Sequence, residues 1–199
     1  MEMYQYNDNL KLLYTSKKAK PFFVDVPLMG YLTFEGCGHP REEDFQKSCE
    51  ALYTISYLLK FEIVRKQLNM DYKVNPMEVT WYLDKSNKKT IFTWTMMIMQ
   101  PEFINEEMVE RAKEIARIKK KNIEYDRLNY NKIEFGKCIQ CFHAGDYNLM
   151  NDTLNRMQVF AELNKVNCDL YTHDIYLNDM RKTKMDNYKT IMRVKVQKR

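Results

Sequence analysis

The sequence predicts an α+β fold made of two β-α-β-β halves that repeat one another. Two observations carry this prediction: strand-like and helix-like segments follow one another in the same order twice, and a long amphipathic helix separates the two series. We expect duplicated β-α-β-β modules with antiparallel sheets around a pseudo-twofold cleft. The first module covers about 22–100, the connecting helix about 105–121 and the second module about 131–197 of a single domain, 1–199.

The composition is globular, with a large share of tyrosine and methionine. The 199 residues are 45% hydrophobic and 30% charged, and they include 14 Tyr and 14 Met. Tyr carries a polar tip on an apolar ring, and Met adapts to irregular gaps. The surplus therefore suits a half-wet ligand cavity as well as an ordinary core, and composition leaves both interpretations open.

Several partner classes are not expected. No run approaches the roughly 18 apolar residues of a membrane span, and no signal-peptide core follows Met1, which predicts a cytoplasmic protein without a membrane partner. The five Cys are an odd number without a regular framework, which favours reduced thiols. The net charge is +5, but the basic runs near 117–121 and 181–199 accompany no zinc-finger spacing or RNA-binding strand. A solvated surface is favoured over direct nucleic-acid binding.

The chain begins with a short helix and a strand. Residues 8–15 are expected to be helical, capped by Asn7 or Asp8. The apolar cluster at 29–34 is expected to be the core of the first strand, because a glycine-rich turn follows it.

A longer helix is predicted over 41–61. Apolar residues recur there at helical spacing, and acidic residues occupy its first turn, where the helix dipole favours negative charge. Tyr53 and Tyr57 are four residues apart and so share one face of this helix.

A hairpin and the connecting helix complete the first half. Residues 77–84 and 90–99 alternate as strands do, with a polar turn at 85–89 between them. The helix over 105–121 has Asn105 as its N-cap, acidic residues in its first turn and lysines at its end.

The second half restarts the pattern. Residues 132–143 predict a strand, and 151–164 predict an amphipathic helix. Residues 172–178 and 188–197 then predict a closing hairpin. The shared order of elements is what relates the two halves.

Cysteine and histidine give no convincing chemical motif. Cys138 and Cys141 lie three apart on a predicted strand, so they point to opposite faces and are badly placed to chelate together. His39, His143 and His173 are scattered along the sequence. Neither a serine-nucleophile motif nor a phosphate-binding loop is present. We expect no metal and no cofactor.

Acidic and aromatic residues gather on the predicted hairpins. Strand alternation puts Glu78 and Trp81 on opposite faces unless a bulge intervenes, whereas Asp174 and Tyr176 share a face. Trp94 lies on the partner strand of the first hairpin. A carboxylate walled by aromatic rings binds lipophilic cations, and one removed from water can act as a general base. Periodicity by itself favours a solvated carboxylate.

Over nearly its whole length the sequence resembles the GyrI-like small-molecule-binding family, particularly its stand-alone bacterial members. The order and spacing of the similar pieces carry the resemblance more than any one of them. These pieces are FEGCGHP at 34–40, LYTISY at 52–57, PMEVTW at 76–81, QPEF at 100–103, CIQCFHAGDY at 138–147 and HDIYLND at 173–179.

The resemblance implies the duplicated fold and a central pocket lined by acids and aromatics. Relatives of this fold serve as effector-binding domains in multidrug recognition, and some stand-alone members resemble hydrolases. Ligand-binding candidates are Glu78, Trp81, Tyr147, Asp174 and Tyr176, with Tyr53 and Tyr57 lining the pocket from the helix and Trp94 from the partner strand.

Three functions follow as hypotheses. The first is binding or sequestration of lipophilic, cationic small molecules. The second is hydrolysis of cyclopropane rings in DNA-alkylating natural products, with Glu78 and Asp174 as the catalytic carboxylates. The third and weakest is a ligand-sensing partner of a transcription regulator, since both halves of the repeat consume the chain and leave no helix-turn-helix. The oligomeric state stays open.

Three departures from the family weaken the catalytic hypothesis more than the binding one. The family usually has Glu at the position of Asp174, and it often has Glu-Pro where this chain has Met150-Asn151. The turn before Tyr147 also lacks the usual Pro. A base displaced by about one ångström can lose on the order of a hundredfold in rate, whereas ligand binding tolerates such shifts.

Overall fold

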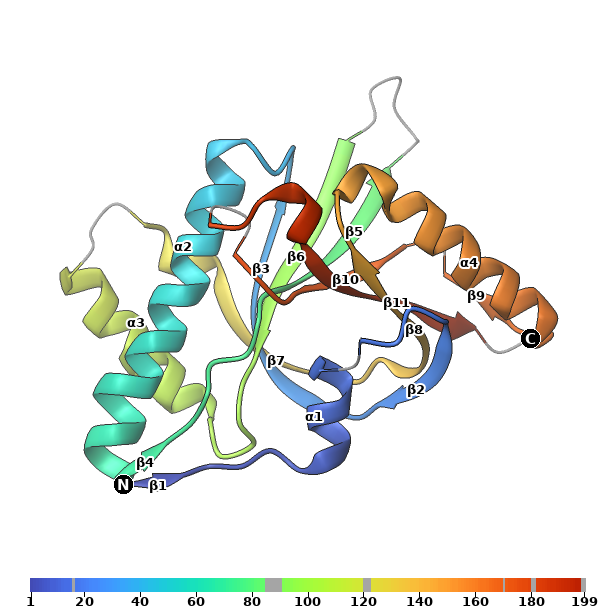
Figure 1. Cartoon of the computed structure of the whole chain (residues 1–199). Helices are drawn as coiled ribbons and strands as arrows, with labels where there is room; N and C mark the ends of the chain where they lie inside the picture. Colours follow the sequence, from blue (N-terminus) through green and yellow to red (C-terminus); the bar gives the residue numbers. More distant parts are fainter. Residues whose placement is uncertain (16, 85–90, 120–122, 170, 180–181, 198–199) are drawn as a thin grey trace. The chain divides into compact units, whose positions relative to one another are not determined.

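Helices alternate with antiparallel strands along the chain in the computed structural model, which confirms the predicted α+β class (Figure 1). The structure describes residues 1–15, 17–84, 91–119, 123–169, 171–179 and 182–197. The chain divides into two compact units, each assembled from segments distant in sequence. Unit 1 comprises Met1–Tyr6, Met29–Asn75 and Tyr82–Ile133, and unit 2 comprises Asn7–Leu28, Pro76–Trp81 and Glu134–Arg199.

The sheet of unit 1 is centred on β3 (Met29–Cys37). This strand pairs antiparallel with β6 (Ile91–Met99) on one side and with β7 (Leu128–Ile133) on the other. A separate parallel pair joins β1 (Glu2–Met3) to β4 (Met70–Asp71). Buried side chains of β3 and β6 form part of the core of this unit.

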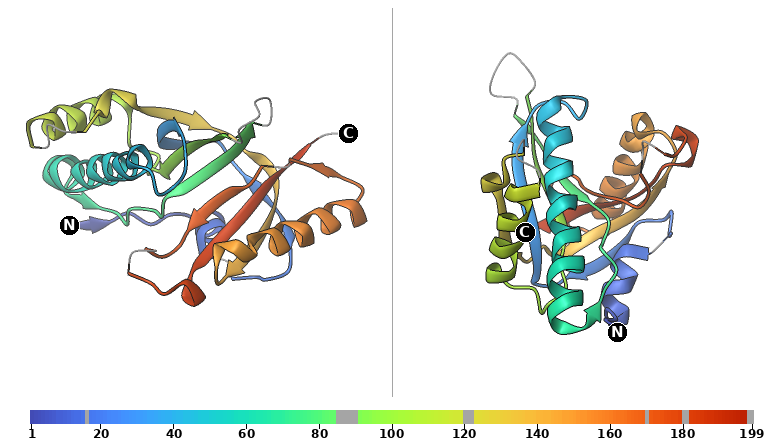
Figure 2. Two further views of the ribbon diagram at one scale, coloured as in Figure 1. Left: turned by 90° about the horizontal axis from the view of Figure 1, so that it is seen from above. Right: turned by 90° about the vertical axis from the view of Figure 1, so that its left-hand side faces the viewer.

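Two helices of unit 1 lie side by side in Figure 2, and the first of them packs on β3 and β6 of the sheet. The first is α2 (Glu43–Leu58), which continues as the π-helix η1 (Leu59–Leu68), and the second is α3 (Glu106–Lys119). The predicted helix over 41–61 is therefore longer than expected and ends at Asn69, which has a left-handed φ of 51°. A 3₁₀ turn, η2 (Tyr125–Arg127), leads from α3 towards β7.

Unit 2 is built on an antiparallel sheet with the strand order β2-β8-β11-β10-β5. Residues Glu78–Trp81, the first part of β5, belong to this unit and form its last strand. The strands are β2 (Phe22–Val26), β8 (Gly136–Ala144), β10 (His173–Tyr176), β11 (Lys189–Gln197) and β5 (Glu78–Asp84), and β9 (Asn167–Cys168) pairs with the end of β11.

The helices of unit 2 pack against its sheet. On α4 (Met150–Leu163), Met157 and Ala161 are buried against apolar side chains of β8 and β11. The helix α1 (Asp8–Thr15) turns Leu13 and Tyr14 inward. Two 3₁₀ turns, η3 (Tyr147–Leu149) and η4 (Met185–Asn187), precede α4 and β11.

Side-chain caps begin α1 and α3 where they were predicted. The Asn7 Oδ1 atom accepts a hydrogen bond from the Leu10 backbone N–H at 2.9 Å, and Asn105 Oδ1 accepts one from Met108 N–H at 3.0 Å. None of the helices in the described residues is long and apolar enough to span a membrane.

Strand boundaries differ from prediction at two places. The single strand expected over 132–143 is two strands, β7 and β8, which belong to different units. Gly136 stands at the break with φ of 66°, a conformation that glycine adopts without strain. The strand predicted over 29–34 is the core of β3, and Pro27 separates it from β2, which was not predicted as a strand of its own. The predicted turn at 85–89 lies outside the described residues.

Candidate functional site

Strands β5 and β10 lie next to each other in unit 2 and carry most of the predicted site residues. Their antiparallel register pairs Val79 with Asp174 and Thr80 with His173. Directly paired residues point to the same face of a sheet, and successive residues alternate. Asp174 therefore lies on one face of this strand pair and Glu78 on the other.

The face of Asp174 holds what we call the acidic–aromatic cluster: Asp174, Trp81, Tyr147, Tyr176 and Tyr188. The Trp81 indole N–H donates to the Tyr176 hydroxyl at 3.1 Å. The Tyr147 ring meets Tyr176 edge-on at a centroid distance of 5.7 Å and stacks on Tyr188 at 4.7 Å. All four aromatic residues are half-buried, so the rings keep some surface open to solvent.

Asp174 is the most perturbed acid of this cluster. Its side chain is buried, with 3% of the residue exposed, and burial raises its pKa to about 7. Hydrogen bonds from Thr172 and Trp81 hold the pKa below the value that burial alone would give, and the Thr172 hydroxyl donates to Oδ2 at 3.3 Å. Among the described residues no hydrogen bond reaches Oδ1. The carboxyl can therefore exist in either protonation state near neutral pH and has an unused acceptor.

Tyr147 stays protonated at physiological pH. Burial raises its pKa to about 12, Tyr188 and Asp174 add to that rise, and a hydrogen bond with Thr190 opposes it. Its hydroxyl is thus a neutral polar group at the side of the cluster. The cluster as a whole offers one titratable carboxyl and several neutral hydroxyl and indole groups.

A tight turn after β8 brings Tyr147 to the cluster. Gly145 has φ of 106°, and the Asp146 side chain then accepts from the Asn148 N–H at 2.9 Å, which starts η3. The buried His143 ring contacts the Asp146 carbonyl oxygen through Nε2 at 3.1 Å. These contacts hold the turn, which contains no proline.

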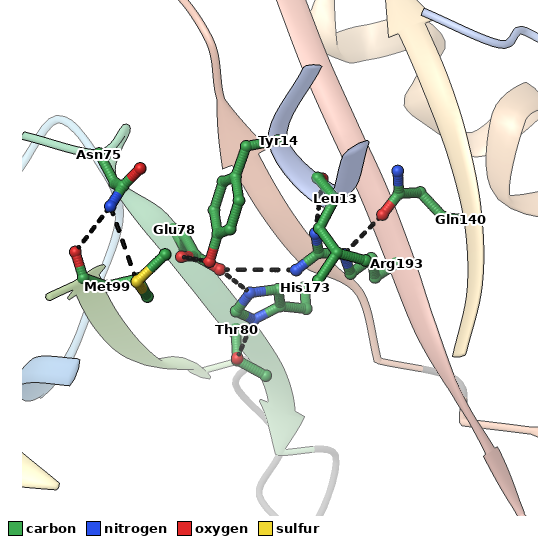
Figure 3. Close-up of polar contacts among 9 residues, drawn as sticks. All are labelled: Leu13, Tyr14, Asn75, Glu78, Thr80, Met99, Gln140, His173 and Arg193. Atoms are coloured by element: carbon green, nitrogen blue, oxygen red, sulfur yellow. Dashed lines mark hydrogen bonds and ion pairs between the residues drawn. The ribbon is translucent and has the colours of Figure 1, made fainter. Parts of the chain in front are cut away.

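The opposite face of the strand pair carries a second polar group, the Glu78 network, formed by Glu78, Tyr14, His173, Thr80 and Arg193 (Figure 3). The Tyr14 hydroxyl donates to Glu78 Oε1 at 2.7 Å, and His173 Nε2 lies 2.6 Å from Oε2. Thr80 Oγ1 lies 2.8 Å from His173 Nδ1. Glu78 is fully buried, and both of its carboxylate oxygens are engaged.

Arg193 ties this network to the rest of unit 2. Its Nη1 atom lies 3.8 Å from Glu78 Oε2, and its Nη2 donates to the Leu13 carbonyl oxygen at 2.6 Å. The guanidinium also donates through Nε to Gln140 Oε1 at 2.8 Å and lies under the Tyr14 ring. Helix α1 thus covers the buried charges with one side chain and one carbonyl group, as Figure 3 shows.

The remaining predicted site residues belong to unit 1. Tyr53 and Tyr57 stack on each other along α2, with centroids 6.3 Å apart, and Tyr57 also stacks on Phe61. Trp94 is buried in the unit 1 core, edge-on to Phe45 at 5.2 Å. The structure brings Trp81, Tyr147, Asp174 and Tyr176 together in unit 2, with Glu78 on the opposite face of the same sheet.

The arrangement of the two hairpins differs from the expected one. Glu78 and Trp81 were expected to face Asp174 and Tyr176 across a cleft, but β5 and β10 are hydrogen-bonded neighbours in one sheet. The alternation of β5 has no bulge at these residues, so Glu78 and Trp81 point to opposite faces, as the unbroken pattern indicates.

Sequence reasoning missed Tyr188 in the cluster and Tyr14, His173 and Arg193 in the Glu78 network. Tyr188 immediately precedes β11, so its position beside Tyr147 depends on a turn that periodicity does not describe. Arg193 occupies the middle of an apolar strand, and such an unexplained charge is the signal that could have pointed to a buried carboxylate partner.

The cysteines and the other histidines show no further site. All five cysteines are reduced thiols, and burial raises the pKa of Cys138 to about 11, which makes it a poor nucleophile. His143 Nδ1 lies 2.9 Å from Thr153 Oγ1 in the interior of unit 2. No three His, Cys, Asp or Glu side chains of the described residues are grouped to hold a metal ion.

Solved structures establish the family. A hydrolase from Listeria innocua is 33% identical, with a TM-score of 0.85 over 94% of this chain and 97% of that chain. An uncharacterised conserved protein from Listeria innocua is also 33% identical, with a TM-score of 0.83 over 92% of this chain and 94% of that chain. The chain belongs to the family of these two Listeria innocua proteins.

A more distant likeness concerns the fold alone. The C-terminal domain of EcmrR is 11% identical, with a TM-score of 0.53 over 90% of this chain and 98% of that domain. It supports the fold that the sequence resemblance implied. No protein-family model and no curated protein matches the chain.

Proposed function

We propose that the protein binds lipophilic organic cations at the acidic–aromatic cluster of unit 2. The observation that supports this most is the state of Asp174, a buried carboxyl with one oxygen that no described residue hydrogen-bonds. The aromatic rings of Trp81, Tyr147 and Tyr176 stand around it. The GyrI-like fold adds support for a ligand-binding role.

The chemistry of the cluster selects for a particular kind of cation. A buried carboxylate without a cationic partner is costly, so a ligand that supplies positive charge gains a large electrostatic interaction. Aromatic faces attract cations as well, by about 0.5–2 kcal/mol each. A small, strongly hydrated cation would lose its water on entry, whereas a bulky cation with delocalised charge and apolar surface loses little. The half-buried rings suit the second kind.

Two ions of one shape and opposite charge test this proposal. Tetraphenylphosphonium and tetraphenylborate have matched apolar surface, so any difference between them reports on charge. We expect the cation to raise the melting temperature of the protein by mass action and the anion to leave it unchanged. Asp174→Asn keeps the side-chain shape and removes the charge, and it should abolish the shift.

The exposed Asp152 supplies the matched control. Asp152→Asn removes an equal charge from the same unit and should behave as the wild type. Equal shifts with both ions, or an unchanged cation shift in Asp174→Asn, would remove the proposal.

A second candidate function, hydrolysis of a strained cyclopropane ring, rests on two observations. A 33% identical relative is a hydrolase, and burial places the pKa of Asp174 near 7, where a carboxylate can accept a proton from water. In this scheme Asp174 takes a proton from water, and the water oxygen attacks the ring CH₂. The ring C–C bond breaks, and its electron pair moves to a conjugated carbonyl oxygen, which is then protonated.

This scheme departs from the expected pair of catalytic carboxylates. Glu78 lies on the other face of the strand pair with both oxygens engaged, so we assign the proton transfer to Asp174 alone. The test is incubation with a cyclopropyl-dienone compound and detection of its hydrated, ring-opened product by mass spectrometry. A product rate that equals the buffer blank, or that survives Asp174→Asn, would end this candidate.

A further inference from the structure

Unit 2 has two carboxyl groups on opposite faces of one strand pair, and the groups that surround them differ. Glu78 has a phenol, an imidazole and a guanidinium as neighbours. The described donors to Asp174 are neutral, namely the Thr172 hydroxyl and the Trp81 indole. A buried ionic network seldom adds net stability over an apolar core, but it can specify which arrangement of the chain forms.

We propose that Glu78 is a positioning residue: its network with Tyr14, His173 and Thr80 fixes the register of β5 against β10 and so holds Asp174 beside Trp81. The inference deepens the proposed function, on which its relevance to binding rests. It gives the second carboxylate of the predicted site a role other than contact with a ligand.

Successive side chains of a β-strand point to opposite faces of the sheet, with a period of two residues. Because paired residues share a face, a slip of one residue between β5 and β10 would move Asp174 to the face of Glu78. Two carboxylates would then compete for the single guanidinium of Arg193, which strongly disfavours that state. In the observed register the His173 ring instead bridges Thr80 and Glu78.

The network also keeps the guanidinium of Arg193 away from Asp174. Arg193 is committed to Gln140, to the Leu13 carbonyl and to the neighbourhood of Glu78 on the far face. The guanidinium of Arg193 therefore lies on the face of Glu78 and not on the face of Asp174. Asp174 is left available for a partner that comes from outside the unit.

A catalytic role for the network itself fits less well. Thr80, His173 and Glu78 follow the order of hydroxyl, imidazole and carboxylate found in nucleophile-activating triads. All three are buried, however, and Tyr14 closes over the carboxylate. This burial prevents a substrate from reaching the Thr80 hydroxyl. A positioning role therefore accounts for the geometry better than nucleophilic catalysis does.

The test is an NMR titration of the Asp174 carboxyl carbon in single-hydroxyl variants. Tyr14→Phe and Thr80→Val each remove one hydrogen bond of the network and keep the side-chain shape. If the network positions Asp174, its carboxyl becomes better solvated in both variants, and its titration midpoint falls by about one pH unit or more towards the ordinary value. Tetraphenylphosphonium affinity, measured where Asp174 is ionised in every variant, should fall about tenfold or more.

Tyr130→Phe is the matched control, because it removes a tyrosine hydroxyl that donates to the Ile104 carbonyl at 2.8 Å in unit 1. It should leave the Asp174 midpoint unchanged. The inference is overturned if Tyr14→Phe and Thr80→Val weaken resistance to urea but keep the wild-type midpoint. The NMR titration requires no ligand, so it decides the positioning role even if the wild-type protein fails to bind the cation.

Discussion

At the scale of single residues, Asp174 is where structure and proposed function meet. The residue occupies a strand position at which Val79 is its direct neighbour and an apolar side chain would be ordinary. A carboxyl there is kept from water and is only partly compensated by Thr172 and Trp81. Local instability of this kind is expected where a ligand completes the site.

Cation affinity should depend on pH through Asp174. Only the ionised carboxyl attracts a cation, and with a pKa of about 7 the ionised fraction falls as the pH falls below neutrality. Tetraphenylphosphonium should bind roughly tenfold more weakly for each pH unit below about 7, and with constant affinity above about 8. Calorimetric titration across this range measures it. A flat profile in the wild type would contradict the assignment, and so would a wild-type profile in Asp174→Asn, in which no binding is expected at any pH.

The same residue should make the unliganded protein less stable as the pH rises. Its pKa is raised from 3.8 in the unfolded chain to about 7 in the fold, so the folded state binds the extra proton between these values. The protonated Asp174 therefore makes its full contribution to the free energy of unfolding below about pH 4. This contribution is lost as the pH rises to about 7, and it amounts to on the order of a few kcal/mol. Asp174→Asn should be more stable than the wild type near pH 8 in urea unfolding. Lower stability of the variant there would refute this linkage.

The residue-level prediction from sequence was strongest where alternation alone decides. Asp174 and Tyr176 were expected to share a face, and β10 is regular enough that they do. The charge of Arg193 in an apolar strand indicates a buried acidic partner, but nothing in the sequence indicates that Tyr14 contacts Glu78, since the two residues lie far apart along the chain. The order of the strands determines which residues are neighbours across a sheet, and local periodicity does not predict that order.

At the scale of elements, the short helix α1 is essential to the Glu78 network. It is a helix of 8 residues whose inward side chains are Leu13 and Tyr14. A helix this short is marginal by itself and depends on its cap and its packing. Through the Tyr14 hydroxyl and the Leu13 carbonyl it completes the Glu78 network. Fraying of α1 should therefore reach the site on the other side of the sheet.

Paired cap variants test this coupling. Asn7→Ala and Asn105→Ala each remove one capping hydrogen bond, from α1 and from α3 respectively. Both should lower the free energy of unfolding by about 1 kcal/mol. Only Asn7→Ala should also weaken hydrogen-exchange protection in α1 and lower the Asp174 titration midpoint. Identical behaviour of the two variants would show that α1 acts only through overall stability.

Helices were predicted better than strands, for a physical reason. α3 and α4 carry amphipathic periodicity, and acidic first turns mark their starts, so local sequence is sufficient. β7 and β8 look continuous because both alternate and a short segment ending at Gly136 joins them. The π-helical extension η1 has no recognised local signal and was not predicted.

At the scale of the whole molecule, the two units exchange segments of the chain. Unit 2 takes α1 and β2 from the N-terminal region, a few residues of β5 from the middle and the rest from the C-terminal region. Its β2–β8 and β5–β10 pairings join these distant segments. Neither half of the sequence therefore contains a complete unit 2.

Fragments should reveal this asymmetry. A fragment spanning 29–133 contains nearly all of unit 1 and should show helical circular dichroism and cooperative unfolding. A fragment spanning 134–199 lacks α1, β2 and β5, and we expect it to stay unfolded. Dispersed NMR signals from the second fragment would contradict this expectation, whereas refolding on addition of a peptide covering 7–28 and 76–81 would support it.

The position of β11 has a consequence for synthesis in the cell. This strand lies between β8 and β10, yet it follows both of them in the sequence. Until it has been synthesised, β8 and β10 lack the strand that joins them, and Arg193 is missing from the Glu78 network. A nascent chain that stalls before β11 would contain nearly all of unit 1 but an incomplete sheet of unit 2, so ligand binding would begin only after β11 has left the ribosome.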